Sequence, residues 1–158
     1  MEINIEERKQ HAVDNFKTGY NCSQAVFLAF ADIFELDERI ARQISAPFGG
    51  GMGRLGEVCG ALSGAFMTVG LKYPVDLPGD KMAKAENYKA VQRVAAPFRE
   101  KFGSIICRDL LDAKKEKPGI NPNDPNAEYF TKKPCAYFVA EAAESLGLEL
   151  RKAVMGIE

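Results

Sequence analysis

Four cysteines are the side chains of this sequence best suited to carry out chemistry: Cys22, Cys59, Cys107 and Cys135. A cysteine thiolate is a nucleophile, exchanges disulfides and binds metal ions. No two of the four lie near each other along the chain, so the Cys-x-x-Cys pattern is absent. Its absence excludes the sequence signatures of thioredoxin-like proteins and of zinc ribbons.

All four cysteines are predicted to lie in the first turn of a helix. The residues that mark these helix starts are Asn21 before Cys22, Glu57 before Cys59, Ser104 before Cys107 and Pro134 before Cys135. A helix start carries unpaired backbone N–H groups and the positive end of the macrodipole, and both stabilise a thiolate over a thiol. We therefore expect each of the four thiols to have a lowered pKa and a raised reactivity.

The elements that must position these cysteines are helices, because apolar residues recur with the helical period in nearly every segment. We expect helices over residues 5–18, 22–34, 38–46, 57–71, 81–102, 105–113 and 134–146, with a kink or break at Pro97 and an exposed proline-rich loop at 117–126. The sequence thus predicts an all-α fold. It is a single helical bundle of about six helices with a glycine-rich loop before a central apolar helix, in one domain that covers residues 1–158.

The glycine-rich stretch, FGGGMGRLG at residues 48–56, precedes the predicted central helix. It contains a G-x-G-x-x-G pattern, but the strand that precedes this pattern in dinucleotide-binding proteins is missing, and no P-loop lysine follows. We interpret the stretch as a loop that brings backbone close to Cys59. Gly60 and Gly64, one helical turn apart, would let a neighbouring helix approach closely.

Composition places the chain among globular proteins: it has 158 residues, 46% hydrophobic and 27% charged. The net charge of −1 provides no field that would attract nucleic acid or an anionic membrane. The longest uncharged stretch, residues 58–71, is shorter than the roughly 20 residues of a membrane-spanning helix. The charged segment at residues 1–9 lacks a secretory pattern, and four cysteines are too few for a disulfide-stapled scaffold. We expect a cytoplasmic protein with no nucleic-acid or membrane partner.

The cysteines allow three functions. A redox protein would use them for thiol/disulfide exchange or electron transfer with a redox partner whose identity the sequence leaves open. Alternatively, Cys22, Cys59, Cys107 and Cys135 would be metal ligands for zinc or an iron–sulfur cluster, although such sites usually contain at least one close cysteine pair. In the third case they are inert, because cysteine packs well as a small apolar residue. The sequence leaves open whether there is any cofactor, how the cysteines pair, and the oligomeric state.

The residues around these cysteines resemble a known family. The segments that carry the resemblance are YNCSQAV at residues 20–26, FGGGMG at 48–53 and CGALSG at 59–64, followed by Cys107 and Cys135. They are similar to the C-GCAxxG-C-C family of redox-active proteins, with the difference that Cys59 precedes Gly60 here, whereas the family label places the cysteine after the glycine. The resemblance implies a redox role for all four cysteines and no settled substrate.

A shared site requires a particular geometry. The helix starts that carry the four cysteines must converge, and Cys22 and Cys59 must be close enough to be joined by a disulfide with little backbone movement. Cys107 and Cys135 would lie near the same end of the bundle. Two other residues, Tyr20 and Arg54, lie near a cysteine in the sequence and can donate a hydrogen bond to sulfur, so we expect them to support the site.

Overall fold

The computed structural model describes residues 2–112, 114 and 119–154. Within these ranges the regular elements are helices, and the only β pairing is an isolated antiparallel bridge between Val58 and Ile106. In chain order the elements are α1 (Ile5–Thr18), α2 (Cys22–Leu28), the 3₁₀ helix η1 (Ala31–Phe34), α3 (Glu38–Ser45), the 3₁₀ helix η2 (Ala46–Phe48), α4 (Gly49–Met52), α5 (Gly60–Lys72), α6 (Lys81–Phe102), α7 (Cys107–Leu110), α8 (Ala127–Lys132) and α9 (Pro134–Val154). The predicted all-α fold is confirmed.

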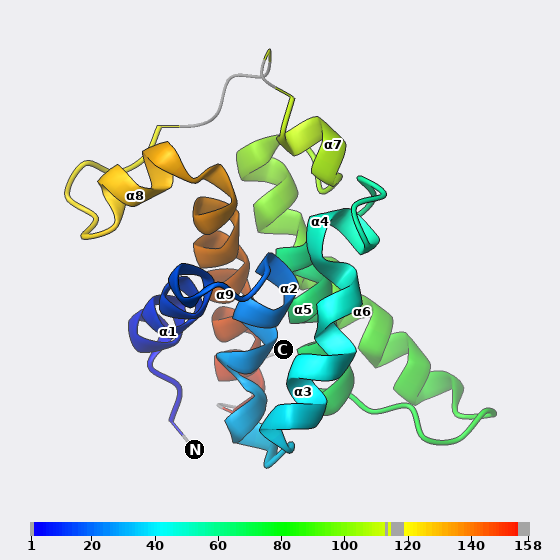
Figure 1. The fold of residues 1–158 in the computed structure, drawn as a ribbon. Helices are drawn as coiled ribbons and strands as arrows, with labels where there is room; N and C mark the ends of the chain where they lie inside the picture. The colour runs from blue at the N-terminus through cyan, green and yellow to red at the C-terminus, as the bar shows by residue number, and fades with distance from the viewer. Residues whose placement is uncertain (1, 113, 115–118, 155–158) are drawn as a thin grey trace.

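Two helices form the centre of the bundle (Figure 1). α5 packs against α2, α6 and α9, and nearly every residue in its first two turns is buried, which confirms the predicted central apolar helix. α9 contacts α1, α2, α5, α6 and α8, and it continues to Val154, eight residues past the predicted end at Leu146. The main apolar core therefore contains residues from Ile3 to Leu150, and a smaller apolar cluster forms around Phe27 and Leu28.

The first two helices begin where the sequence predicts. The side chain of Asn4 caps α1, and Gly19 ends this helix in the left-handed conformation with φ 117°. Asn21 and Gln24 form the expected capping box at the start of α2, with hydrogen bonds of 3.0 and 3.1 Å. α2 ends at Leu28 instead of near Phe34, because the chain tightens there into 3₁₀ geometry. The apolar residues continue across this change, so their pattern could not reveal it.

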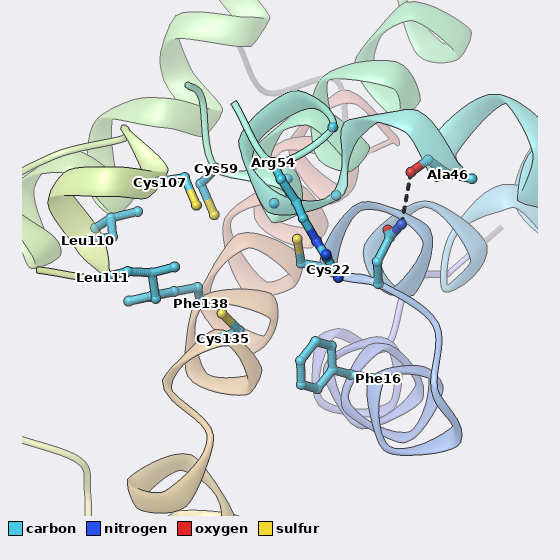
Figure 2. Close-up of a pocket in the computed structure, with 15 residues that line it drawn as sticks. Phe16, Cys22, Ala46, Arg54, Cys59, Cys107, Leu110, Leu111, Cys135 and Phe138 are labelled. Atoms are coloured by element: carbon cyan, nitrogen blue, oxygen red, sulfur yellow. Dashed lines mark hydrogen bonds between the residues drawn. The ribbon is translucent and has the colours of Figure 1, made fainter. Parts of the chain in front are cut away.

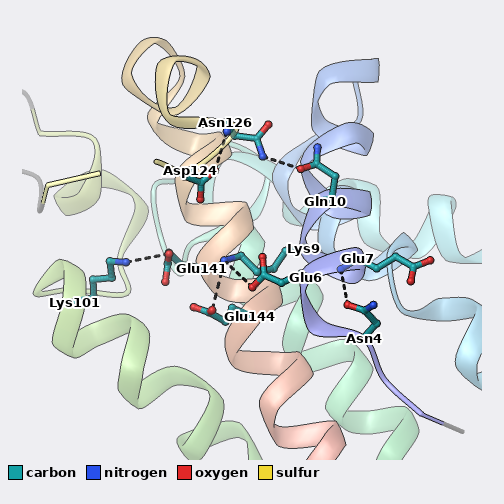
Figure 3. A network of polar contacts seen from close by, with 10 residues as sticks. All are labelled: Asn4, Glu6, Glu7, Lys9, Gln10, Lys101, Asp124, Asn126, Glu141 and Glu144. Carbon is teal, nitrogen blue, oxygen red and sulfur yellow. Dashed lines mark hydrogen bonds and ion pairs between the residues drawn. The ribbon is translucent and has the colours of Figure 1, made fainter. Parts of the chain in front are cut away.

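Polar contacts fix α1 against the C-terminal part of the chain (Figure 3). The ammonium group of Lys9 on α1 lies 3.5 Å from the carboxylate of Glu144 on α9. The side-chain amide of Asn126, at the end of the proline-rich loop, donates a 2.8 Å hydrogen bond to Gln10 on α1. These contacts hold the middle of α9 and the residue before α8 against α1.

The remaining helices differ from the prediction in detail. α6 is continuous through Pro97, so the predicted break does not occur. α7 is a single turn, and part of its predicted extent to residue 113 lies outside the described residues. The short helix α8 was not predicted. In the described part of the chain, no helix combines the length and the apolar character needed to cross a membrane.

Candidate functional site: a cavity lined by four cysteines

The four cysteines line one cavity of about 480 Å³ (Figure 2). Cys22 and Cys107 are the first residues of α2 and α7, Cys135 is the second residue of α9, and Cys59 directly precedes α5. Figure 2 shows the four sulfur atoms directed toward the same space. The predicted convergence of these helix starts is confirmed. The prediction that Cys22 and Cys59 can be joined by a disulfide stays a prediction.

Hydrogen bonds of Asn21 and Gln24, the residues on either side of Cys22 and Ser23, hold the start of α2 in place. The side chain of Asn21 accepts a hydrogen bond from the backbone N–H of Gln24 and donates one of 2.9 Å to the carbonyl of Ala46. The side chain of Gln24 donates a 3.0 Å hydrogen bond to the carbonyl of Arg42 in α3. The backbone that carries Cys22 is therefore tied to α3 and to the turn after it.

Two glycines bring α5 directly against α2, as predicted. A β-carbon on Gly60 would overlap with the Sγ atom of Cys22, and a β-carbon on Gly64 would overlap with the carbonyl oxygen of Ser23. Because Gly60 directly follows Cys59, this close contact also brings Cys22 near Cys59. The spacing of the glycines thus sets the position of two cysteines relative to each other.

Cys59 and Cys107 are held together by a short pairing of two loops. The backbone N–H of Cys59 donates a 2.8 Å hydrogen bond to the carbonyl of Ile105, and the N–H of Cys107 donates one of 2.6 Å to the carbonyl of Glu57. These bonds flank the bridge between Val58 and Ile106. In an antiparallel pairing of this register, the side chains of Cys59 and Cys107 project from the same face. The pairing also explains why α5 begins at Gly60 and not at Glu57.

An aromatic cluster anchors the start of α9, which carries Cys135. The ring of Phe138, one turn after Cys135, packs edge-on against Phe102 of α6 with 4.9 Å between centroids. Tyr137 packs in the same way against Phe102 at 5.2 Å. Pro134 is the first residue of α9, the position the sequence predicted. Cys135 is thus fixed to α6 as well as to its own helix.

The glycine-rich stretch is a tight turn that separates the cysteine-bearing helices. Residues 50–54 all have positive φ, including the non-glycine residues Met52 and Arg54 at 67° and 66°. A β-carbon on Gly49 would lie 2.6 Å from the side chain of Asn21, and one on Gly51 would lie 2.6 Å from Cβ of Cys107. The turn therefore lies against the starts of α2 and α7, whereas the sequence predicted only an approach to Cys59.

The pKa values of two cysteines differ from the prediction. Burial raises the pKa of the Cys59 thiol far above its ordinary value, and the charge of Cys22 raises it further. The backbone N–H groups of Ala61 and Leu62 lower this pKa but do not outweigh burial. Burial, followed by the charge of Cys22, also raises the pKa of Cys107. The predicted lowering is therefore wrong for Cys59 and Cys107, because loss of hydration opposes ionisation more than a helix start favours it.

The apolar wall of the cavity was not predicted. It consists of Phe16, Leu110, Leu111 and Phe138. Three of these residues follow a cysteine by one helical turn: Leu110 and Leu111 come after Cys107, and Phe138 comes after Cys135. Side chains three or four residues apart share a helix face, so this spacing could have identified them.

Of the two expected supporting residues, Arg54 lines the cavity and Tyr20 does not. Tyr20 packs against the smaller apolar cluster around Phe27 and Leu28, and it lines a separate cavity with His11. Tyr20 therefore does not line the four-cysteine cavity, although it is close to Cys22 in the sequence. The prediction for Tyr20 is therefore wrong.

The metal-binding alternative requires a group of side chains placed so that together they could bind a metal ion. Across residues 2–112, 114 and 119–154, no group of three or more histidine, cysteine, aspartate or glutamate side chains is placed so that it could hold a metal ion. Cys22, Cys59, Cys107 and Cys135 line one cavity, but no three of them are placed to hold a single metal ion such as zinc.

Comparisons with known proteins agree with the resemblance seen in the sequence. The family model described as "Putative redox-active protein (C_GCAxxG_C_C)" matches residues 20–147, a range that contains all four cysteines. An uncharacterized protein of Archaeoglobus fulgidus is 26% identical over 147 residues, which cover 88% of this chain and 90% of that protein. No solved structure shows a significant match to the chain.

Proposed function

The chain belongs to the C_GCAxxG_C_C family of redox-active proteins, and we propose that its four-cysteine cavity carries out thiol/disulfide exchange. One observation carries this proposal: four cysteines from distant parts of the sequence line a single cavity. Cysteines that act only as small apolar residues have no physical reason to share a cavity wall. Thiols that pass a disulfide among themselves must lie within reach of one another and of a substrate.

Cys22 is the residue best placed to attack a substrate disulfide. It is half-buried and lines the cavity, whereas Cys59 is only 4% exposed. A charge on Cys22 opposes ionisation of both Cys59 and Cys107 by raising their pKa values. A negative charge on the Cys22 sulfur therefore disfavours a second thiolate at either neighbouring cysteine. The nucleophile is then a single thiolate at the start of α2.

The proposed attack step balances as follows. The Cys22 thiolate attacks one sulfur of a substrate disulfide, a bond forms between Cys22 and that sulfur, and the other half of the substrate leaves as a thiolate that takes up a proton. Cys22 is then part of a mixed disulfide and carries no charge. One of the causes that raise the pKa of Cys59 is thereby removed.

Cys59 resolves the mixed disulfide in the second step. Its thiol loses a proton, its sulfur bonds to the sulfur of Cys22, and the remaining half of the substrate leaves as a thiol. The substrate gains two electrons, and the pair Cys22 and Cys59 loses them. The close contact of Cys22 with Gly60 supports this assignment, because it brings α5 and the residue directly before it against Cys22.

Cys107 and Cys135 complete the proposed site as a second dithiol. Internal exchange would transfer the disulfide from the first pair to these two residues, which returns Cys22 and Cys59 to their thiol forms and requires no other reactant. The paired loops that hold Cys59 beside Cys107 support this transfer.

A single-turnover reaction of the fully reduced protein with hydroxyethyl disulfide tests the proposal. We expect the wild type to lose two thiols without retaining an adduct. The Cys59→Ser variant should accumulate a mixed disulfide on Cys22, seen as an increase in intact mass. The Cys22→Ser variant should react at least about tenfold more slowly. If Cys22→Ser keeps the wild-type circular dichroism spectrum and reacts at the wild-type rate, the proposal is wrong.

Anaerobic purification followed by metal analysis separates this function from the metal-binding alternative. Thiol/disulfide exchange predicts a Cys22 thiol that reacts with an alkylating reagent in the folded protein and no stoichiometric metal. One zinc ion or one iron–sulfur cluster per chain, with all four thiols protected from alkylation, would overturn the exchange proposal.

A further inference from the structure

Arg54 is the one charged residue among those that line the four-cysteine cavity in the described part of the chain. Figure 2 shows its side chain extending into this cavity in the direction of Cys22. The guanidinium group makes no hydrogen bond or ion pair with any described residue. Arg108, by contrast, pairs with Glu57 at 3.2 Å. The cavity thus contains a cation whose charge no residue in the described part of the chain balances.

The glycine-rich turn directs this arginine into the cavity. Arg54 has a φ of 66°, a conformation that non-glycine residues rarely adopt. The stem of its side chain crosses over Gly50, where a β-carbon would lie 2.8 Å from Cγ of Arg54. A side chain at position 50 would therefore displace the arginine. The left-handed conformation at position 54 and the absence of a side chain at position 50 together allow the Arg54 side chain to extend toward Cys22.

The size and the walls of the cavity indicate what such a cation could bind. A volume of about 480 Å³ is typical of sites for small molecules and exceeds what a single inorganic anion fills. The wall formed by Phe16, Leu110, Leu111 and Phe138 offers apolar surface to the body of a ligand. A guanidinium group binds a carboxylate through two parallel hydrogen bonds.

We propose that the substrate is a small disulfide that bears a carboxylate, with the carboxylate bound by Arg54 and the disulfide directed at Cys22. This inference rests on the proposed thiol/disulfide exchange and specifies its substrate class. The electron balance is that of the exchange steps above: the disulfide becomes two thiols, and Cys22 and Cys59 become one disulfide. The carboxylate takes no part in the bonds that form and break, so its role is to position the substrate.

Three symmetrical disulfides of similar length test this substrate class: dithiodipropionate with carboxylates, hydroxyethyl disulfide without charge, and cystamine with ammonium groups. We expect the reduced wild type to react about fivefold faster with dithiodipropionate than with hydroxyethyl disulfide, and most slowly with cystamine. In Arg54→Gln the rate with dithiodipropionate divided by the rate with hydroxyethyl disulfide should fall to about one. Arg54→Lys should restore part of the preference for dithiodipropionate. Using the ratio cancels any change in the reactivity of Cys22.

Arg39→Gln is the matched control, because Arg39 is exposed on α3, does not line the cavity, and carries the same charge. It should keep the wild-type ratio. If Arg39→Gln lowers the ratio as much as Arg54→Gln, the preference comes from net charge, and the proposed carboxylate site is wrong. Equal rates of the wild type with all three disulfides would also overturn the site, while leaving thiol/disulfide exchange intact.

A binding measurement separates the two proposals. Suberate has the carboxylates of dithiodipropionate but carbon in place of its two sulfurs, so it cannot be reduced. We expect suberate to slow the alkylation of Cys22 by iodoacetamide in the wild type and not in Arg54→Gln. Protection by suberate without any reaction of the disulfides would support the anion site and overturn the exchange function. If the disulfides react at equal rates and suberate does not protect Cys22 from alkylation, the exchange function stands and the carboxylate site is wrong.

Discussion

The Sγ atom of Cys22 occupies the space that a β-carbon on Gly60 would need. Gly60 is the first residue of α5 and directly follows Cys59. The contact between Cys22 and Gly60 therefore determines how closely α2 and α5 approach, and with it how far apart the two cysteines lie. Any side chain at position 60 must displace the sulfur of Cys22.

The first prediction follows from this contact. Gly60→Ala should lower the free energy of unfolding by about 1–3 kcal/mol, because the added methyl group overpacks a tight interface. It should also slow formation of the disulfide between Cys22 and Cys59, because it pushes Cys22 away. Urea unfolding measures the first effect, and thiol counting after brief oxidation measures the second.

Gly70→Ala is the control for this prediction. Gly70 lies on the same helix, and nothing is within 4 Å of the position of its added β-carbon. Alanine is the better helix former, so Gly70→Ala should raise stability by about 0.5–1 kcal/mol and leave disulfide formation unchanged. If both alanine variants behave alike, the packing of Cys22 against Gly60 does not control the pair.

The second prediction concerns pH. In the unfolded chain the thiols of Cys59 and Cys107 ionise near a pKa of about 8.5, whereas in the folded protein both pKa values are raised. Below about pH 8.5 both states keep these protons, so stability does not depend on the two thiols. Above it only the unfolded state loses them, and the free energy of unfolding falls by up to about 1.4 kcal/mol per pH unit for each thiol.

Urea unfolding under reducing conditions, repeated from about pH 7 to about pH 10, measures this dependence. Cys59→Ala should have a smaller slope above about pH 8.5 than the wild type, since it removes the thiol whose pKa is raised by the deeper burial. Lysines and tyrosines also ionise in this pH range, but they are the same in both proteins. Their contribution to the free energy of unfolding therefore cancels when the two proteins are compared at each pH. Equal slopes would show that the Cys59 thiol ionises as easily in the folded protein as in the unfolded chain.

The third prediction addresses the ion pair between α6 and α9. Nε of Arg93 donates a 2.8 Å hydrogen bond to a carboxylate oxygen of Glu149, whose side chain is 5% exposed, and Nη2 of Arg93 lies 2.6 Å from the same oxygen in an ion pair. Glu149→Gln leaves the charge of Arg93 unbalanced and should cost about 1–3 kcal/mol in unfolding free energy. Glu128→Gln removes an exposed partner of Lys132 and should change stability by less than about 0.5 kcal/mol. Equal effects of the two substitutions would contradict the structural role given to Glu149.

The sequence predicted that cysteines lie at helix starts through local signals, such as Asn21 before Cys22 and Pro134 before Cys135. That these helix starts converge was expected from the family resemblance, because local signals do not determine which helix starts meet. The glycine spacing at positions 60 and 64 likewise predicted a close helix contact without knowledge of the partner. Helix starts and close helix contacts that depend on a few neighbouring residues could therefore be predicted correctly.

Features that depend on distant residues could not be predicted in this way. The true start of α5 depends on the pairing of Val58 with Ile106, which no local pattern indicates. The raised pKa of Cys59 depends on burial by several helices, whereas the sequence argument considered only its own helix. The direction of Arg54 depends on a left-handed turn that glycines permit but do not impose.

The last prediction tests whether the start of α2 controls the reactivity of Cys22. Asn21→Ala removes the capping box and the hydrogen bond to the carbonyl of Ala46, so it should cost about 1 kcal/mol in stability. It should also slow the alkylation of Cys22, because a frayed first turn offers the thiolate less of the positive end of the helix macrodipole.

Asp80→Ala provides a control of the same kind at another helix. Asp80 caps α6 by accepting a 2.9 Å hydrogen bond from the N–H of Ala83, and it does not line the four-cysteine cavity. Its removal should cost a similar amount of stability, about 1 kcal/mol, without changing the alkylation rate of Cys22. Rates at constant pH, followed by mass spectrometry of the peptide that contains Cys22, distinguish the two variants. If Asp80→Ala slows alkylation as much as Asn21→Ala, general loss of stability controls the thiol. If only Asn21→Ala does so, the cap at the start of α2 sets the reactivity of Cys22.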